Sequence, residues 1–213
     1  MNKENQKRMD EVYKNMPLEE IPWNRETPPD LLVDLINTGK LLPCKAIDLG
    51  CGAGNYAIYL AEKGFDVTGV DFSSTAIKIA EENAKARRVK CKFITADVVD
   101  QLSKISGRWD FAYDWGLLHH ILPEHREKYV KNVYGILNPK AKYLSLCFSE
   151  KDKGFEGDEK YRKTFIGSTL YFSCEDELRE LFAPYFDIIE LRTTEITGKF
   201  ETHVFNYVFM SKK

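Results

Sequence analysis

From residue 44 onward, short apolar runs alternate with longer stretches in which apolar residues recur at helical spacing. This alternation is typical of a parallel sheet whose strands are joined by crossover helices. The apolar runs are rich in aliphatic, aromatic and β-branched residues, and they predict strands over residues 45–49, 66–71, 92–96, 109–114 and 143–148. The helical spacing, with its Gly, Ser and Pro boundaries, predicts helices over residues 56–63, 75–88 and 123–137.

The last third of the chain changes rhythm. Its pattern predicts a helix over residues 175–182 and strands over residues 186–193 and 203–211. The linker between these two strands is too short to hold a crossover helix, so they should pair antiparallel. We therefore expect an α/β, doubly wound fold with a mainly parallel seven-stranded sheet that ends in a C-terminal antiparallel hairpin.

The segments outside the sheet complete a single domain over residues 1–213. Residues 3–15 and the stretch after Pro28-Pro29-Asp30 predict helices, which makes residues 1–40 an N-terminal helical cap on a core of residues 41–149. Residues 150–172, rich in charge, Gly and aromatics, are either a mobile lid or a solvated loop. A C-terminal helix and hairpin follow over residues 173–213.

Composition narrows the class of protein. A chain of 213 residues that is 43% hydrophobic buries roughly 70% of its unfolded surface, so it needs no disulfides or structural metal. The net charge of −2 argues against a dedicated nucleic-acid binder. The polar N-terminus and the lack of a long apolar run predict a cytoplasmic protein with no membrane span. Five cysteines without a C-x-x-C pair make a zinc site or disulfide frame unexpected, and we expect no metal.

The stretch Ala46 to Asn55, AIDLGCGAGN, places three glycines in the turn from the first strand to the next helix. Glycine lets the backbone approach a ligand closely, and the helix N-terminus offers free N–H groups. The same glycines also fit a dinucleotide fingerprint, Gly52-x-Gly54-x-x-Ala57, with Asp71 further along. The spacing of the glycines alone therefore does not distinguish a dinucleotide from another ligand.

Charge favours one of them. A pyrophosphate in this turn would meet Asp48 with no Lys or Arg between residues 51 and 60 to balance it. A ligand with an ammonium and a sulfonium, such as S-adenosylmethionine, would gain from a row of carboxylates that follow successive strands, namely Asp48, Asp71, Asp97 and Asp114. Asp71 has the place to accept from both ribose hydroxyls, and Asp97 could face the adenine edge. Taken singly, each Asp could equally be a helix cap or a turn residue.

Residues 44–148 resemble the class I S-adenosylmethionine-dependent methyltransferases. The resemblance is carried by the motifs AIDLGCGAG, VTGVDFS, ITADV and WDFAYDWGLLHHI, in that order, followed by ILNPKAKYLSL. It implies the Rossmann-like methyltransferase fold. It also implies a cofactor site whose candidate members are Asp48, Gly50, Cys51, Gly52, Asn55, Asp71, Phe72, Asp97, Val98 and Asp114.

Within that resemblance each group has an implied part. Gly50, Cys51 and Gly52 would lie against the methionine end, with Asp48 and Asp114 nearby. Asp71 would hold the ribose and Phe72 would pack on the adenine, while Asp97 and the Val98 backbone would read the adenine amine. The sequence departs at Lys140-Ala141, where relatives carry two glycines, so the turn before the fifth strand is expected to differ.

The segment Ile21-Pro22-Trp23-Asn24 looks more narrowly like the thiopurine and tellurite-resistance branch, in which a Trp near this point covers the cofactor. Trp23 is therefore a candidate cofactor contact, and Tyr13 would belong to the same lid. An anchoring core residue is the competing interpretation of Trp23.

Methyl transfer is an in-line displacement, so soft nucleophiles need little help, whereas alcohols and amines benefit from a base. His119, after the fourth strand, is the candidate base, with a buried structural histidine as the alternative. Asp114-Trp115-Gly116-Leu117 lacks the Pro-Pro-aromatic pattern of adenine-amine methylases, which disfavours flipped-base chemistry.

We expect methyl transfer from S-adenosylmethionine to a small molecule, with a soft S, Se or Te nucleophile as a candidate acceptor. An NAD-dependent oxidoreductase and a catalytically idle cofactor-binding scaffold are the alternatives. The sequence leaves the oligomeric state open.

Overall fold

The computed structural model describes residues 3–155, 160–164 and 166–213. Seven strands form one sheet in the order β3-β2-β1-β4-β5-β9-β8. These strands are β1 (Lys45–Leu49), β2 (Asp66–Asp71), β3 (Lys92–Thr95), β4 (Trp109–Trp115), β5 (Leu137–Phe148), β8 (Phe186–Thr197) and β9 (Thr202–Lys212). The first five are parallel, and β9 pairs antiparallel with both β5 and β8. The predicted fold, including its terminal hairpin, is confirmed.

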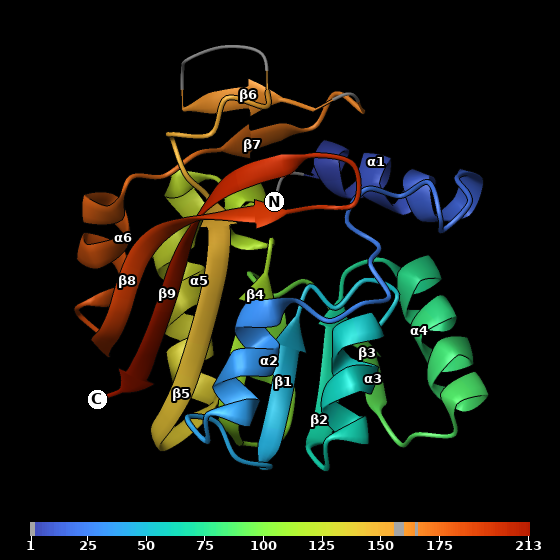
Figure 1. Cartoon of the computed structure of the whole chain (residues 1–213), viewed down its shortest axis with the longest axis horizontal. Coiled ribbons are helices and arrows are strands. Elements are labelled where there is room, and N and C mark those ends of the chain that lie inside the picture. The colour runs from blue at the N-terminus through green and yellow to red at the C-terminus, as the bar shows by residue number, and fades with distance from the viewer. Residues whose placement is uncertain (1–2, 156–159, 165) are drawn as a thin grey trace.

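Helices cover both faces of this sheet. They are α1 (Lys3–Asn15), α2 (Asp30–Asn37), α3 (Asn55–Glu62), α4 (Ser74–Arg87), α5 (Pro123–Ile136) and α6 (Glu175–Phe182). Figure 1 shows α2 and α3 on the near side and α5 on the far side. Side chains alternate between the two faces along each strand: Ile47 packs in the cluster that contains α5 residues, and its neighbour Ala46 packs in the cluster with α2 and α3.

Two boundaries differ from the sequence-based expectation by more than one residue. The fifth strand begins at Leu137, six residues early, because Trp109 pairs with Leu137 before a register shift leads to the Phe111–Lys142 pair. Lys140 lies within this shift at a φ of 64°, in the left-handed region that glycine adopts most easily. The hairpin strand β8 runs on to Thr197, since its pairing with β9 continues to Thr202.

The carboxyl ends of the parallel strands meet at the upper edge in Figure 1, where three additional segments gather. Helix α1 lies over one end of this edge, the tip of the β8–β9 hairpin lies near its middle, and a two-stranded ribbon of β6 (Tyr161–Lys163) and β7 (Thr169–Tyr171) lies above it. This ribbon belongs to the predicted lid of residues 150–172. Residues 156–159 and 165 of that lid are outside the described residues.

Candidate cofactor site

The glycine turn after β1 is fixed to β2 by main-chain hydrogen bonds. The amides of Gly50 and Cys51 both donate to the Val70 carbonyl, over 2.8 and 3.1 Å. Gly52 has a φ of 52°, and a Cβ at this residue would lie 2.5 Å from the Tyr13 hydroxyl oxygen. Glycine is therefore required at residue 52 both for the backbone conformation and for the close approach of a neighbour.

Asp71, at the end of β2, connects the turn to the next segment. Its carboxylate is only 6% exposed and accepts from the amides of Gly52 (3.0 Å) and Ser73 (2.9 Å) through different oxygens. Burial raises the pKa of this carboxyl to about 6, against the opposing effect of the amides. Each oxygen keeps a second lone pair, so the carboxylate can still accept from a diol.

A small hollow of about 20 Å³ lies next to this carboxylate. Five of the predicted cofactor residues line it, namely Gly50, Asp71, Phe72, Asp97 and Val98. They come from the ends of three strands, so the sheet has brought together groups that are up to 48 positions apart in the chain. The other lining residues are Gln6, Ala96, Val99, Leu117 and Ile121.

Helix α1 closes over this hollow with one face. The Gln6 amide donates to the Asp97 carboxylate, and the Ser73 hydroxyl donates to Asp10 over 2.5 Å. The Tyr13 hydroxyl lies above Gly52. Sequence reasoning missed Gln6 and Asp10, although the spacing of residues 6, 10 and 13 puts all three on one helix face and could have identified them.

The side chains of Trp23 and Asn55 form hydrogen bonds within the N-terminal cap and do not line the hollow. Trp23 is 37% exposed, and its indole N–H donates to the Tyr13 hydroxyl over 3.0 Å. The Asn55 amide donates to the Asn24 side chain over 2.7 Å, which ties the segment around Trp23 to the N-terminus of α3. Direct contact of either side chain with the cofactor stays a prediction.

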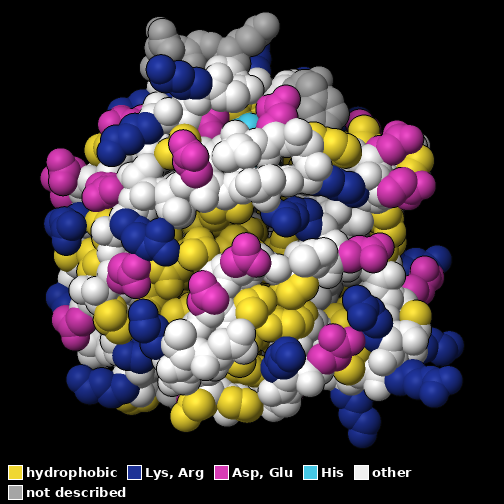
Figure 2. Space-filling view, viewed as in Figure 1, with side chains coloured by type: hydrophobic (Ala, Val, Ile, Leu, Met, Phe, Trp, Pro, Cys, Tyr) yellow, Lys and Arg dark blue, Asp and Glu magenta, His cyan; other side chains and the backbone are white. Residues whose placement is uncertain are grey.

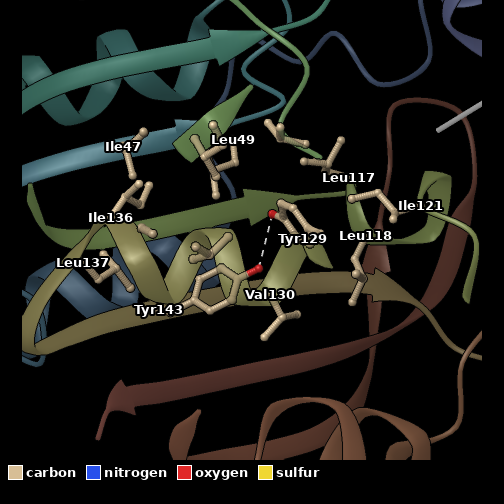
Figure 3. Close-up of a cluster of buried hydrophobic side chains, with 14 of the residues drawn as sticks. Ile47, Leu49, Leu117, Leu118, Ile121, Tyr129, Val130, Ile136, Leu137 and Tyr143 are labelled. Carbon is tan, nitrogen blue, oxygen red and sulfur yellow. Dashed lines mark hydrogen bonds between the residues drawn. The ribbon is translucent and has the colours of Figure 1, made fainter. Parts of the chain in front are cut away.

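The expected row of four carboxylates is not a row in the structure. Asp114 is fully buried, and its carboxylate accepts from Tyr143, Tyr129 and Ser145. Figure 3 shows Tyr129 and Tyr143 directed at each other inside the apolar cluster beneath the sheet. Asp114 is therefore not among the residues that line the hollow, and its place near the methionine end stays a prediction.

Asp48 projects from the opposite face of the sheet. It pairs in register with Tyr113, one residue before Asp114, so strand alternation directs the two carboxylates apart. Asp48 is 3% exposed, and burial, with smaller effects from the charges of Asp71 and Asp114, raises its pKa to about 7. Cys51 also points away from the hollow, because its sulfur lies 2.9 Å from where a Cβ on Gly69 would be.

His119 lies in a short 3-10 turn, Leu118–His120, after β4 and is 4% exposed. Its Nδ1 accepts from the Phe148 amide over 3.3 Å, so the proton of the neutral ring must be on Nε2. Burial, with smaller effects from the neighbouring His120, Arg126 and His203, lowers the pKa of His119 well below its ordinary value. This tautomer makes Nε2 a hydrogen-bond donor, and the general-base role of His119 stays a prediction.

Two further findings concern the described residues as a set. They contain no group of three or more His, Cys, Asp or Glu side chains able to hold a metal ion. None of the helices in these ranges is both long and apolar enough to cross a membrane.

Residues 46–140 match a family model described as a methyltransferase domain. The 2-heptyl-1-hydroxyquinolin-4(1H)-one methyltransferase of Mycobacteroides abscessus is 31% identical over 172 residues, which cover 80% of this chain and 70% of that protein. A ubiquinone biosynthesis O-methyltransferase of Coxiella burnetii is 30% identical, with 71% and 65% covered.

Solved structures with a similar fold are also methyltransferase-like in architecture or share the same overall chain path. One, described as "Conversion of a Disulfide Bond into a Thioacetal Group during Echinomycin Biosynthesis", matches with a TM-score of 0.81 and 26% identity over 98% of this chain and 93% of the other. Magnesium protoporphyrin IX methyltransferase from Synechocystis with bound SAH shares the fold at a TM-score of 0.71 and 19% identity, with 100% and 95% covered. This chain belongs to the class I S-adenosylmethionine-dependent methyltransferase family.

Proposed function

We propose that the hollow beside Gly50 and Asp71 binds S-adenosylmethionine and that the methyl group is transferred to a small-molecule acceptor. The observation that carries the proposal is the convergence of the glycine turn, the Asp71 carboxylate and the Asp97–Val98 segment on one hollow. None of its described lining residues is Lys or Arg, so a pyrophosphate would find no counter-charge. This disfavours a nicotinamide dinucleotide as the ligand.

Within this site, Asp71 is assigned to the ribose, Phe72 to the adenine face, and Asp97 with the Val98 backbone to the adenine edge. Gly50 and Gly52 would lie under the methionine part. The Gln6 amide donates to the Asp97 carboxylate, as an adenine amine would. Gln6 is therefore expected to release Asp97 when the cofactor binds.

The proposal is tested by calorimetric titration with S-adenosylmethionine and its demethylated product. Asp71→Ala should weaken binding by about 1–3 kcal/mol, because hydrogen bonds to a charged acceptor are lost. Asp66→Ala, at the exposed start of the same strand, should leave the affinity unchanged. A well-folded chain that binds neither compound would refute the proposal.

A soft sulfur, selenium or tellurium nucleophile is the candidate acceptor that needs the least from the site. This acceptor class is supported by His119, because the Nδ1 lone pair of its ring already accepts from the Phe148 amide and is not free to take a proton from an acceptor. The disulfide chemistry named for the structurally similar protein also involves sulfur. The hydroxyquinolone relative points instead to a heteroaromatic acceptor. His119→Ala separates the cases: a large rate loss with intact cofactor binding would indicate base catalysis.

A further inference from the structure

A second histidine lies on the acceptor side of the sheet. Most residues that line the hollow follow β2 and β3, which lie on one side of β1, and Leu117 and Ile121 line it from the segment after β4. Strands β4 and β5 lie on the other side of β1. If adenosine fills the hollow and methionine lies over the β1 turn, an acceptor must approach from the β4–β5 side. His203, at the start of β9, lies there beside Phe148, the last residue of β5, with ring centroids 5.3 Å apart.

His203 is held by a buried carboxylate. Asp152 is 2% exposed, and it accepts from the amides of Gly154 (2.8 Å) and Val204 (2.6 Å) and contacts His203 Nδ1 at 3.2 Å. Burial alone would raise the pKa of Asp152, but these hydrogen bonds and the imidazole lower it, so the carboxylate stays ionised. An ionised carboxylate only accepts, and therefore Nδ1 of His203 must donate.

This hydrogen bond fixes the tautomer. With the proton on Nδ1, the Nε2 lone pair of the neutral ring is free to accept, which is the reverse of His119. No hydrogen bond reaches Nε2 from residues 3–155, 160–164 or 166–213. The ring is stacked on Phe155, with centroids 5.2 Å apart and planes 23° apart, so its orientation is also restricted.

Charged and titratable groups of several segments surround the His203 ring. Asp152 faces Nδ1, and a carboxylate oxygen of Glu201 lies 3.9 Å from Nε2. Arg162 binds the main-chain carbonyls of Asp152 and Glu150 and stacks on Phe172, and neutral His119 lies across Phe148. The carboxylates of Asp152 and Glu201 are thus the acidic groups that face the two ring nitrogens.

We infer that Asp152 and His203 form the acid–base pair of the acceptor site, which allows a protic oxygen or nitrogen acceptor. The inference rests on the proposed function. As the acceptor oxygen or nitrogen bonds to the methyl carbon and the carbon–sulfur bond breaks, the acceptor's proton passes to Nε2 of His203. The sulfur leaves as a neutral thioether, and the imidazolium later releases its proton to water. Asp152 is a positioning residue that sets the tautomer.

The first experiment compares naphthalene acceptors that differ only in the reacting group: 2-naphthol, 2-naphthylamine and 2-naphthalenethiol. His203→Asn keeps a donor for Asp152 but has no base, and it should lower kcat for the hydroxyl or amine on the order of 10²- to 10⁴-fold with KM little changed. It should also remove the acidic limb of the kcat–pH profile. Methylation of the thiol should change by less than about threefold, because that group needs little base help.

Controls keep the outcomes distinct. His125→Asn, on α5, should match the wild type. Calorimetry with the demethylated cofactor should give every variant the same affinity as the wild type. A wild-type chain that does not bind this cofactor would refute the proposed function, whereas it would say nothing about Asp152 and His203. Wild-type protein that methylates only the thiol, or a His203→Asn variant with the wild-type rate on the hydroxyl, would overturn the inference.

A second experiment needs no acceptor. Imidazole ¹⁵N spectra of the full chain with the demethylated cofactor at pH 8 should show His203 with the proton on Nδ1 and His119 with it on Nε2. Asp152→Asn should disturb the first pattern and leave the second. A His203 ring that carries its proton on Nε2 would overturn the inference, whatever acceptors are methylated.

Discussion

At Gly52, one added carbon would strain the backbone conformation and would also clash with Tyr13 of the N-terminal cap. Its φ of 52° strains any other residue, and an added Cβ would lie 2.5 Å from the Tyr13 hydroxyl oxygen. Gly52→Ala should therefore lower affinity for the demethylated cofactor more than tenfold and destabilise the chain by roughly 1–3 kcal/mol. Calorimetry and thermal unfolding measure the two effects.

Gly135 provides the matched control for this substitution. It lies within α5, and no atom would come within 4 Å of an added Cβ. Gly135→Ala should leave cofactor affinity unchanged and stabilise the chain by up to about 1 kcal/mol, because alanine favours the helix. Equal effects of the two substitutions would show that the clash at Gly52 has no consequence.

Asp48 couples stability to pH. Its pKa is raised by burial to about 7 from an ordinary 3.8, so the folded chain retains a proton that the unfolded chain releases. The resulting stabilisation is complete below about pH 4 and is lost as the pH rises through 7. Asp48→Asn should therefore raise Tm at pH 8 relative to the wild type, with a smaller difference at pH 4.5.

The same substitution should weaken binding of S-adenosylmethionine at pH 8 if Asp48 lies near the cationic end of the cofactor, as the sequence predicts, because a negative charge would then be removed from that end. Thermal unfolding at the two pH values and calorimetry at pH 8 test both effects. Asp66→Asn, exposed at the start of β2, is the control and should change neither. A Tm at pH 8 that falls for Asp48→Asn would contradict the burial argument.

At the scale of elements, α1 is the part of the cap whose contacts are best defined. Removing the Gln6 and Asp10 side chains eliminates its hydrogen bonds to Asp97 and Ser73, worth about 1–3 kcal/mol together. The double variant Gln6→Ala/Asp10→Ala should therefore increase amide exchange in residues 3–15 roughly 5- to 150-fold. Hydrogen-exchange mass spectrometry without ligand measures this opening.

Glu11→Ala is the control on the same helix. Glu11 is half exposed and makes only a surface contact with Lys7 at 3.9 Å, a type of pair that contributes little. Its substitution should leave exchange in residues 3–15 within about threefold of the wild type. If the double variant also exchanges at the wild-type rate, α1 is held by its apolar packing rather than by these bonds.

At the scale of the whole molecule, cofactor binding should stabilise the folded chain by mass action. At a ligand concentration of 100 Kd the gain is about 2.7 kcal/mol, which raises Tm by roughly 5–11 °C for a chain of this size. NADH at the same concentration should produce no shift. A rise with NADH and none with the demethylated cofactor would reverse the ligand assignment.

The surface of the molecule is consistent with a small ligand. Figure 2 shows acidic and basic side chains interspersed around a central apolar area on this face, without a continuous basic stripe. The chain as a whole carries a net charge of −2. Its expected cytoplasmic location and its independence of nucleic acid remain predictions from composition.

Most of the sheet could be predicted because its signals are local. Apolar runs, Gly64 and Ser73 mark where strands and helices begin and end, and the short linker to β9 forces antiparallel pairing. The register shift at Lys140 could not be predicted, since it depends on how β4 and β5 pair rather than on either sequence alone. The same holds for the contact between Gln6 and Asp97, which are 91 residues apart.

The amino-acid sequence by itself determined the order of the elements, the glycine turn and the family, because backbone conformation and apolar periodicity are properties of neighbouring residues. Only the tertiary structure decided that Asp48 and Asp114 lie on opposite faces of the sheet, since a strand's pattern does not say which of its faces meets which helix. It also decided the tautomers of His119 and His203, because each is set by a partner that packing brings from a distant segment, Phe148 for one and Asp152 for the other.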